Sequence, residues 1–423
     1  MAIMEKGYPL GESFKQLLKD LNPAGIGTGL VATLFSTLGP GLIVMNAAKS
    51  GGLTDPQAVS WLLAIYSFGG LATMFMVLRY RIPVVIAFSI PGAVLLGKVL
   101  SNFTIQEAVG AYMLVGVITL LLTVTGAIKK VVDNIPVPIM LGMVGGVLFS
   151  FGLGLFKASI EQPGIYGVML LVFFASMAFK SFSRKVPPII VSIVVGVVLL
   201  ALNGKIQSVP LNLEIARPQF VLPSLSFRAI IDISMPLFFL VIGVQNIQAV
   251  GVLLAEEYKP PINSMYLVPT VGAFYNALIG GHCAVTAGPS TAICSSQAAH
   301  EKKEKRYVAA FAEGVFWFCF ALLAKVAVDS VNMVPKEFTA VLAGIAMFDV
   351  FSSAFRGAFG SKFRYGALVS FFIAVTNLSI LGIGAAFWAI VFGVLTSLVL
   401  ELADFKAMNG KQSAPAAITA PAK

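Results

Sequence analysis

Two short stretches of the sequence combine a proline–glycine pair with hydroxyl side chains inside apolar surroundings. They read AFSIPGAVLLG (residues 87–97) and AVTAGPSTAICS (residues 284–295). The residue before a proline favours an extended backbone, whereas proline itself suits the first turn of a helix. Each stretch therefore predicts an extended segment followed by a helix, whose free N–H groups and positive dipole end suit an anion. The candidate binding residues here are Phe88, Ser89, Gly92, Thr286, Gly288, Ser290 and Thr291.

Three side-chain amides lie within apolar runs and are candidates for binding the same anion. Gln245 and Asn246 stand mid-way along PLFFLVIGVQNIQAVGVLL, and Asn46 lies in GLIVMNAAKSGGL. An amide N–H can donate to a carboxylate directly or through a water molecule. The alternative is a hydrogen bond between helices, worth ~0.6–2 kcal/mol in a membrane. We favour the ligand role.

Ionisable side chains inside apolar segments are costly to bury and are therefore candidates for proton transfer. Glu313 is the first candidate, although a position near the membrane surface would also explain it. His282 precedes the second proline–glycine stretch, where a side chain that titrates near neutral pH would suit proton exchange. A solvated loop histidine is the alternative interpretation.

The other charges in apolar segments have structural interpretations. Lys325 and Asp329 are four residues apart, so we expect them to share a helix face and to pair near its outer end. Glu107 and Asp349 are expected at helix ends rather than in a proton relay.

The residue inventory argues against several other functions. The two histidines lie outside any HExxH motif, and no GxSxG or P-loop is present, so we expect no enzyme. The three cysteines, Cys283, Cys294 and Cys319, lack CxxC spacing and predict packing rather than a metal site or a disulfide. The net charge of +10 is explained by basic loops that orient a membrane protein, so no nucleic-acid partner is expected. No cofactor is expected either.

The elements that must position these residues are membrane helices. The chain is 58% hydrophobic and 11% charged, against roughly 25% charged in soluble domains. Spans of ~20 apolar residues predict an all-α polytopic membrane protein with about 14 segments. They are 28–48, 57–78, 83–97, 107–128, 137–156, 163–180, 187–202, 229–255, 262–280, 283–299, 306–328, 336–354, 364–378 and 384–404.

Lysine and arginine counts predict the orientation of these segments. If both termini are cytoplasmic, 21 of the 29 basic residues fall on the inside and seven on the outside, with Lys325 within a segment. This bias follows the positive-inside rule and predicts that both termini are cytoplasmic. The expected location is the plasma (inner) membrane. Each half has seven segments, an odd number, so the second half enters the membrane from the side opposite to the first. This arrangement predicts a 7+7 inverted repeat. The proline–glycine stretches fall in segments 3 and 10, the third of each half. A packing kink is the alternative for a single break, but matched breaks favour a site.

Four blocks carry a resemblance to a known family. They are YRIPVVIAFSIPGAVLLG (80–97), MPLFFLVIGVQNIQAVGVL (235–253), TAICSSQAAHEKKEKRYVAAFAEGVFW (291–317) and LSILGIGAAFWAIVFG (378–393). In these blocks the chain resembles the benzoate/proton symporter (BenE) family, whose fold is similar to that of uracil/proton symporters and sulfate/bicarbonate carriers. The resemblance implies proton-coupled uptake of benzoate or a similar small aromatic carboxylate. It also implies an elevator mechanism, in which a core domain moves against a gate domain.

The implied domains follow the segment boundaries. A cytoplasmic N-terminal segment (1–27), which includes the amphipathic stretch SFKQLLKDL, precedes the core domain at 28–128 and 229–328. The gate domain takes 129–228 and 329–404, and 405–423 is an Ala/Pro-rich tail predicted to be disordered. A homodimer through the gate domain is expected by analogy alone.

Two features of the sequence depart from the related families. The stretch AGPS at 287–290 replaces the apolar-Thr run that precedes TAIC in the family, which alters an expected binding edge. Nucleobase symporters of this fold carry acidic residues near the positions of Gln245 and Ser290. Because this sequence has no acid there, the proton-carrying residue of those families has no counterpart at these positions. A nucleobase or inorganic-anion transporter, or an anion channel, remains the alternative function.

Overall fold

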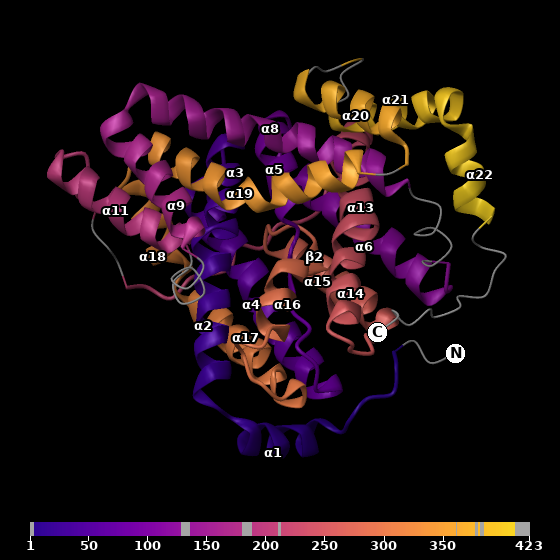
Figure 1. Cartoon of the computed structure of the whole chain (residues 1–423), viewed down its shortest axis with the longest axis horizontal. Coiled ribbons are helices and arrows are strands. Elements are labelled where there is room, and N and C mark those ends of the chain that lie inside the picture. The colour runs from indigo at the N-terminus through magenta and orange to yellow at the C-terminus, as the bar shows by residue number, and fades with distance from the viewer. Residues whose placement is uncertain are drawn as a thin grey trace.

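The computed structural model describes residues 4–127, 136–179, 188–209, 213–360, 362–376, 380 and 385–410. The described chain is helical apart from two three-residue strands and a single bridge residue (Figure 1). Within these described ranges, five helices are long and apolar enough to cross a membrane, or up to seven if each sharply bent pair is one span. Four shorter apolar helices of 10–17 residues accompany them. The chain is therefore a helical, multi-pass membrane protein.

The elements of the first half follow the predicted segments closely. They are α1 (Leu10–Asp20), α2 (Pro23–Leu38), α3 (Pro40–Ser50), α4 (Asp55–Tyr80), β1 (Ile86–Phe88), α5 (Ile90–Val99), η1 (Leu100–Asn102), α6 (Ile105–Val124), α8 (Val137–Glu161), η2 (Pro163–Gly167), α9 (Val168–Ala178) and α11 (Pro188–Leu202).

The second half begins with a long helix that contains two π-helical stretches. Its elements are α12 (Phe227–Ala229), η3 (Ile230–Ser234), α13 (Met235–Phe239), η4 (Leu240–Gln245), α14 (Asn246–Ala255), α15 (Ile262–Leu278), β2 (Ala284–Thr286), α16 (Gly288–Ser295), η5 (Lys303–Lys305), α17 (Tyr307–Leu322), α18 (Ala324–Asn332), α19 (Lys336–Phe359), α20 (Arg364–Thr376), α21 (Ala385–Leu400) and α22 (Leu402–Gly410).

The two strands form a small antiparallel sheet in the interior. Ile86 pairs with Thr286, and Phe88 pairs with Ala284. Both strands are buried along their whole length. Extended backbone at this depth is tolerated because each strand satisfies the other's hydrogen bonds within protein. The extended stretch followed by a helix, predicted for both proline–glycine stretches, is confirmed.

Packing divides most of the helices into two groups. In the first group, α17 packs along α2 and α4, α15 along α6, α3 along α5, and α14 along α16. In the second, α19, α20 and α21 pack around α8, and α9 lies along α11. Glycines allow the close approaches: a Cβ on Gly29 would stand 2.5 Å from the Ala309 carbonyl oxygen, and one on Gly142 would stand 2.3 Å from that of Ala367. The groups meet where α3 contacts α19, α5 contacts α8 and α2 contacts α11.

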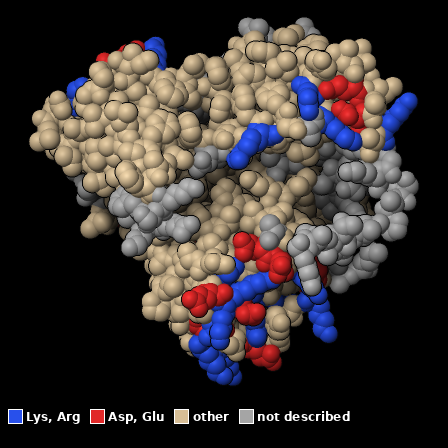
Figure 2. Space-filling model, in the orientation of Figure 1, with Lys and Arg blue, Asp and Glu red and all other residues tan. Residues whose placement is uncertain are grey.

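Helix α1 lies across one end of the first group (Figure 1). Asp20 accepts hydrogen bonds from Gln16 and Tyr307 and pairs with Lys305 at 3.3 Å. Burial raises the pKa of Asp20, but these hydrogen bonds and the Lys305 charge outweigh burial and hold it below its usual value. Charged side chains gather around this end, whereas most of the visible surface is uncharged, as a lipid-facing surface requires (Figure 2).

Several details differ from the prediction. The first segment is interrupted at Gly39, between α2 and α3, where Pro40 cannot continue the hydrogen-bond ladder of α2. Asp349 lies within α19 rather than at either end of it, at the break between Phe348 and Phe351 where the helix bends by 42°. Helix α22 extends to Gly410 and covers the start of the predicted disordered tail. Residues 411–423 lie outside the described chain.

Other local predictions are confirmed. The stretch SFKQLLKDL forms most of α1. The Lys325 ammonium pairs with both carboxylate oxygens of Asp329. Glu107 lies in the first turn of α6, where it forms a capping box with Thr104. These features are local, so the spacing of a few residues is enough to predict them.

Candidate functional site

A cavity of about 520 Å³ lies where the two packing groups meet. The first group contributes β1, β2, the first turns of α5 and α16, and parts of α2, η4, α14 and α17. The second contributes Val137, Leu141 and Val144 from α8 and Ala346, Ser353 and Ala354 from α19. The volume falls in the range of ~300–1,000 Å³ that is usual for small-molecule sites.

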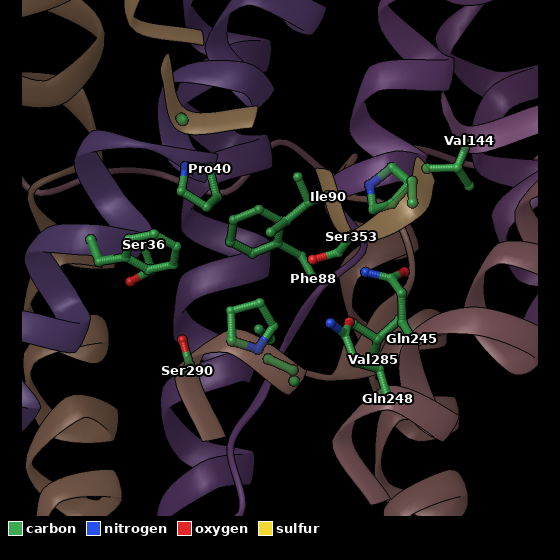
Figure 3. Close-up of a pocket in the computed structure, with 18 of the residues that line it drawn as sticks. Ser36, Pro40, Phe88, Ile90, Val144, Gln245, Gln248, Val285, Ser290 and Ser353 are labelled. Carbon is green, nitrogen blue, oxygen red and sulfur yellow. The ribbon is translucent and has the colours of Figure 1, made fainter. Parts of the chain in front are cut away.

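Most of the cavity wall is apolar, with a few polar groups (Figure 3). Phe35, Phe88 and Trp317 supply aromatic surface. Gln245 and Gln248 lie on one side, and Ser36 and Ser290 lie on the other (Figure 3). Such a wall suits a ligand with an apolar ring and one polar end.

The amide of Gln245 is held in place by the proline–glycine stretch of the first half. The Ser89 hydroxyl donates to Gln245 Oε1 at 2.6 Å and itself accepts from the Gly92 N–H at 3.0 Å. Because the oxygen of the amide is thus occupied, its NH2 group is the part left to face a ligand. Gln248, one helical turn further on, is exposed to the cavity and packs against Gly288, where a Cβ would stand 2.8 Å from its Cγ.

The first turns of α5 and α16 both reach the cavity, but their caps differ. Ser89 is the N-cap of α5 and its hydroxyl binds the Gly92 N–H. Ala287 is the N-cap of α16 and has no side-chain acceptor. The first N–H groups of a helix have no partner within that helix. In α16 the Ala287 N–H binds the Val85 carbonyl and Pro289 has no N–H, so the N–H groups of Gly288 and Ser290 are the ones left for an anion.

Glu313 lies directly behind the first turn of α16. Its side chain is fully buried, and its Oε2 accepts a hydrogen bond from the Cys294 thiol at 3.2 Å. Ser290, one turn before Cys294 on the same helix, is a second neighbour of this carboxyl and also lines the cavity. Glu313 Oε1 has no hydrogen-bond partner, and no ion pair is found for this carboxyl among the described residues. A buried acid therefore stands one side chain away from the cavity.

His282 is buried and lies outside the cavity. The Trp61 indole N–H donates to its Nδ1 at 2.9 Å, so the proton of the neutral ring is on Nε2, which donates to the Ser89 carbonyl at 2.8 Å. Both ring nitrogens are thus engaged. The ring holds the end of β1 against the turn that precedes β2, which is a structural role.

The remaining residues predicted for the site lie away from this cavity. Asn246 Oδ1 accepts from the Thr286 N–H at 2.8 Å, and the Thr286 hydroxyl donates to the Met265 carbonyl. The Thr291 hydroxyl accepts from the Val85 N–H. These bonds tie α14, α15 and α16 to the sheet. Gly92 packs against Leu237, and Asn46 lines a separate cavity.

The structure also adds residues that the sequence reasoning missed. Gln248 follows Gln245 at the i, i+3 spacing that places two side chains on one helix face, and this spacing was a usable signal. Ser36 accepts from the Trp317 indole N–H at 2.7 Å, and its carbonyl accepts from Tyr66. Ser353 comes from α19, far away in the sequence. No local pattern marks Ser36 or Ser353 as cavity residues.

Comparisons with solved structures show the fold. The transmembrane domain of a cyanobacterium bicarbonate transporter, BicA, covers 91% of this chain and 97% of its own length, with a TM-score of 0.54 and 15% identity. SLC26A9 covers 95% of this chain and 72% of its own, with a TM-score of 0.61 and 12% identity. Murine Slc26a9 in the inward-facing state gives a TM-score of 0.59 at 15% identity over 93% of this chain and 71% of its own.

Comparisons of sequence show the family. A benzoate membrane transport protein of Acinetobacter baylyi is 32% identical over 387 residues, which cover 91% of this chain and 97% of the relative. The inner membrane protein YdcO of Escherichia coli is 28% identical over 386 residues, which cover 91% and 98%. Residues 19–399 match the family described as benzoate membrane transport protein, a family of transporters rather than enzymes. With this match and the SLC26-like fold around its cavity, the chain belongs to the benzoate membrane transport protein family.

Proposed function

We propose that this protein is a secondary active transporter that takes up benzoate or a similar small aromatic carboxylate together with a proton. The observation that carries the proposal is the cavity between the packing groups, where the uncapped first turn of α16 and the amides of Gln245 and Gln248 surround an otherwise apolar space. Its volume is ample for a single-ring acid.

The two ends of the substrate have separate partners in this proposal. The carboxylate accepts hydrogen bonds from the N–H groups of α16, the Ser290 hydroxyl and the NH2 group of Gln245. Hydrogen bonds to a charged group are worth ~1.5–3 kcal/mol each. The ring packs between Phe88 and Trp317, which line the cavity at its apolar side. Burial of an aromatic ring supplies affinity without fixing its substituents.

Glu313 is the proposed proton carrier. It is buried within the first packing group, it has no cationic partner among the described residues, and its neighbour Ser290 lines the cavity. An aromatic acid that enters as an anion works against an inside-negative potential, at ~2.3 kcal/mol per charge per 100 mV. A proton that travels with it removes that cost.

The architecture we propose is 14 segments in a 7+7 inverted repeat, with segments 3 and 10 broken. The antiparallel pairing of β1 with β2 supports it, because matched elements from opposed halves must run in opposite directions. The first packing group corresponds to the core (28–128 and 229–328) and the second to the gate (129–228 and 329–404). A homodimer through the gate belongs to the same proposal.

We propose that the structure represents an inward-facing state, with both termini on the cytoplasmic side of the inner membrane. The cavity wall uses the first turns of α8 and the second half of α19, the ends that the basic-residue count places inside. On the opposite side, the Asn46 amide donates to the Thr339 carbonyl at 3.2 Å and joins the two groups. Alternating access then consists of the core sliding past the gate.

Reconstitution into proteoliposomes tests this function directly. We expect accumulation of radiolabelled benzoate driven by an inward proton gradient, with little response to membrane potential at fixed internal and external pH. Benzamide, which lacks the charge, should compete about tenfold worse than benzoate. Counterflow should be observed, as expected for a carrier and not for a channel.

Three results would contradict the proposal. Uptake that follows a sodium gradient at constant pH would remove proton coupling. Equal competition by benzamide would remove the carboxylate site. Uptake of sulfate or uracil but not of benzoate would assign the protein to the alternative substrates of this fold.

A further inference from the structure

A second cavity, of about 370 Å³, lies between α3, α8 and α19. It is lined by Asn46, Lys49, Ser50, Gly154, Lys336, Thr339 and Ala340. The loops beside it belong to the side that the basic-residue count places outside: the Asn332 amide binds Asp55 at 3.1 Å, and the Gln207 N–H binds the Met333 carbonyl at 2.8 Å. The cavity is therefore on the external side of the proposed transporter.

Two lysines give this cavity a positive charge. Lys49 lies in the last turn of α3, and Lys336 is the first residue of α19. Their ammonium groups are close enough to repel each other, and neither forms an ion pair within 4.0 Å among the described residues. Asp55 offsets part of the charge on Lys49, and Glu337 lies in the first turn of α19. Neither carboxylate lines the cavity.

The two lysines come from opposite sides of the moving boundary. Lys49 belongs to the first packing group and Lys336 to the second. About one turn away from each lysine, the Asn46 amide donates to the Thr339 carbonyl and joins α3 to α19 at the wall of the cavity. An anion held by both lysines would bridge the groups, and movement of the core past the gate would separate the lysines from each other.

We propose that this cavity is an external anion-binding vestibule, which holds a small carboxylate or an inorganic monoanion between Lys49 and Lys336. Two like charges held near each other in a hollow surface focus the field and concentrate anions there. The identity of the carboxylate, the external location of the cavity and the separation of the two lysines during transport rest on the proposed function, whereas the presence of an anion site between the lysines does not. The site is distinct from the main cavity, since the two share no lining residue.

A cysteine at Gly154 gives a direct readout of the charge in the vestibule. A Cβ at this glycine meets no atom within 4 Å, so Gly154→Cys adds a reactive thiol without displacing a neighbour. The full chain also carries Cys319→Ala, because Cys319 is exposed whereas Cys283 and Cys294 are buried. The rate of modification is measured with an anionic and a cationic methanethiosulfonate reagent of similar size.

We expect the anionic reagent to react faster than the cationic one. Removal of one nearby positive charge in a water-like medium should slow the anionic reagent and speed the cationic reagent by ~5-fold each, so Lys49→Gln and Lys336→Gln should each lower this ratio by up to ~25-fold. Benzoate and chloride are then tested separately as protecting anions. Protection by benzoate identifies a substrate vestibule, and protection by chloride alone identifies an inorganic-anion site.

Matched variants control for general effects. Lys205→Gln removes another external lysine, one that binds Gln162 and lies outside the vestibule, and should leave the ratio unchanged. Leu222→Cys reports on an external position that is 83% exposed and should show no lysine dependence. An unchanged ratio in both single lysine variants, or no protection by either anion, would overturn the proposal. Loss of benzoate uptake with the charge ratio and chloride protection intact would count against the proposed function instead.

Discussion

The two strand–helix units, β1–α5 and β2–α16, occupy matched places in the two halves but differ at the start of each helix. Ser89 and Ala287 hold the N-cap positions, and Gly92 and Ser290 hold the third helical positions. In α5 the cap hydroxyl satisfies the N–H of Gly92, whereas in α16 the cap position has no side-chain acceptor. The serine is thus at the N-cap in the first unit and at the third helical position in the second.

The side chains that contact the two units also differ. The first unit is tied to Gln245 and His282, both of which hydrogen-bond to Ser89. The second unit lies against the buried acid Glu313 through Ser290 and Cys294. The contrast indicates that the unit of the first half supplies side chains held by hydrogen bonds, whereas the unit of the second half supplies N–H groups without a cap and lies against a titratable group. Sequence symmetry between the halves therefore need not mean functional symmetry.

The largest expected effect comes from Glu313→Gln, which removes the acid and keeps the shape of the side chain. Under the proposed function this variant should lose proton-driven accumulation by at least about tenfold, while benzoate binding and benzoate–benzoate exchange persist. Accumulation and exchange in proteoliposomes measure the two properties separately.

Glu313→Asp is the matched control, because it retains a carboxyl. It should keep measurable accumulation. Normal accumulation by the Gln variant would exclude Glu313 as the proton carrier. The two units would then differ only in how they bind the anion.

Next in size is Ala287→Ser, which copies the cap of the first unit into the second. The new hydroxyl should bind the Ser290 N–H, as Ser89 binds that of Gly92, and thus compete with the substrate carboxylate. We expect benzoate affinity to fall about tenfold, the value of one charge-assisted hydrogen bond. Thermal stability should rise, since an N-cap is worth ~0.5–2 kcal/mol.

Ala287→Gly tests the same position without adding an acceptor. Glycine at an N-cap leaves the first N–H groups free, so affinity should stay within about twofold of the parent. Isothermal titration of both variants compares them on one scale. Equal affinity in the Ser and Gly variants would show that the carboxylate does not bind the first turn of α16.

The smallest expected effect on affinity comes from Ser89→Ala. This change removes the cap of α5 and leaves Gln245 Oε1 without its donor. We expect a loss of ~1–3 kcal/mol in the free energy of unfolding and about a threefold loss of benzoate affinity through a less ordered amide. Ser89→Thr keeps the hydroxyl and should retain most of both. A larger effect on affinity than that of Ala287→Ser would reverse the roles assigned to the two units.

The sequence predicted the elements better than it predicted the cavity wall. Proline at residues 91 and 289 dictates where each helix starts, so the two breaks followed from local rules. The two neighbouring amides show where prediction from sequence fails. Both Gln245 and Asn246 are predicted to bind the anion, but successive helical residues point ~100° apart. As a result Gln245 lines the cavity, Asn246 binds the sheet, and Gln248 shares the face of Gln245.

The contribution of the second packing group had no signal in the sequence. Its helices are apolar on all sides, because lipid and protein neighbours both favour apolar side chains. The period of hydrophobic residues therefore does not mark the face of α8 or α19 that meets the cavity. Only the distant contacts between α3 and α19 and between α5 and α8 bring Val144 and Ser353 to the site.

The external linker before α12 follows the first packing group closely. The backbone N–H groups of Ala216, Val221 and Ser224 bind the carbonyls of Leu322, Leu278 and Gln106, so this extended segment lies across the ends of α17, α15 and α6. On the other side, Gln207 is anchored at Met333, next to the start of α19. Fully stretched, the chain from Gln207 to Ala216 reaches about 30 Å. If the first packing group moves against the second, as proposed, the length of this linker sets an upper limit on that movement.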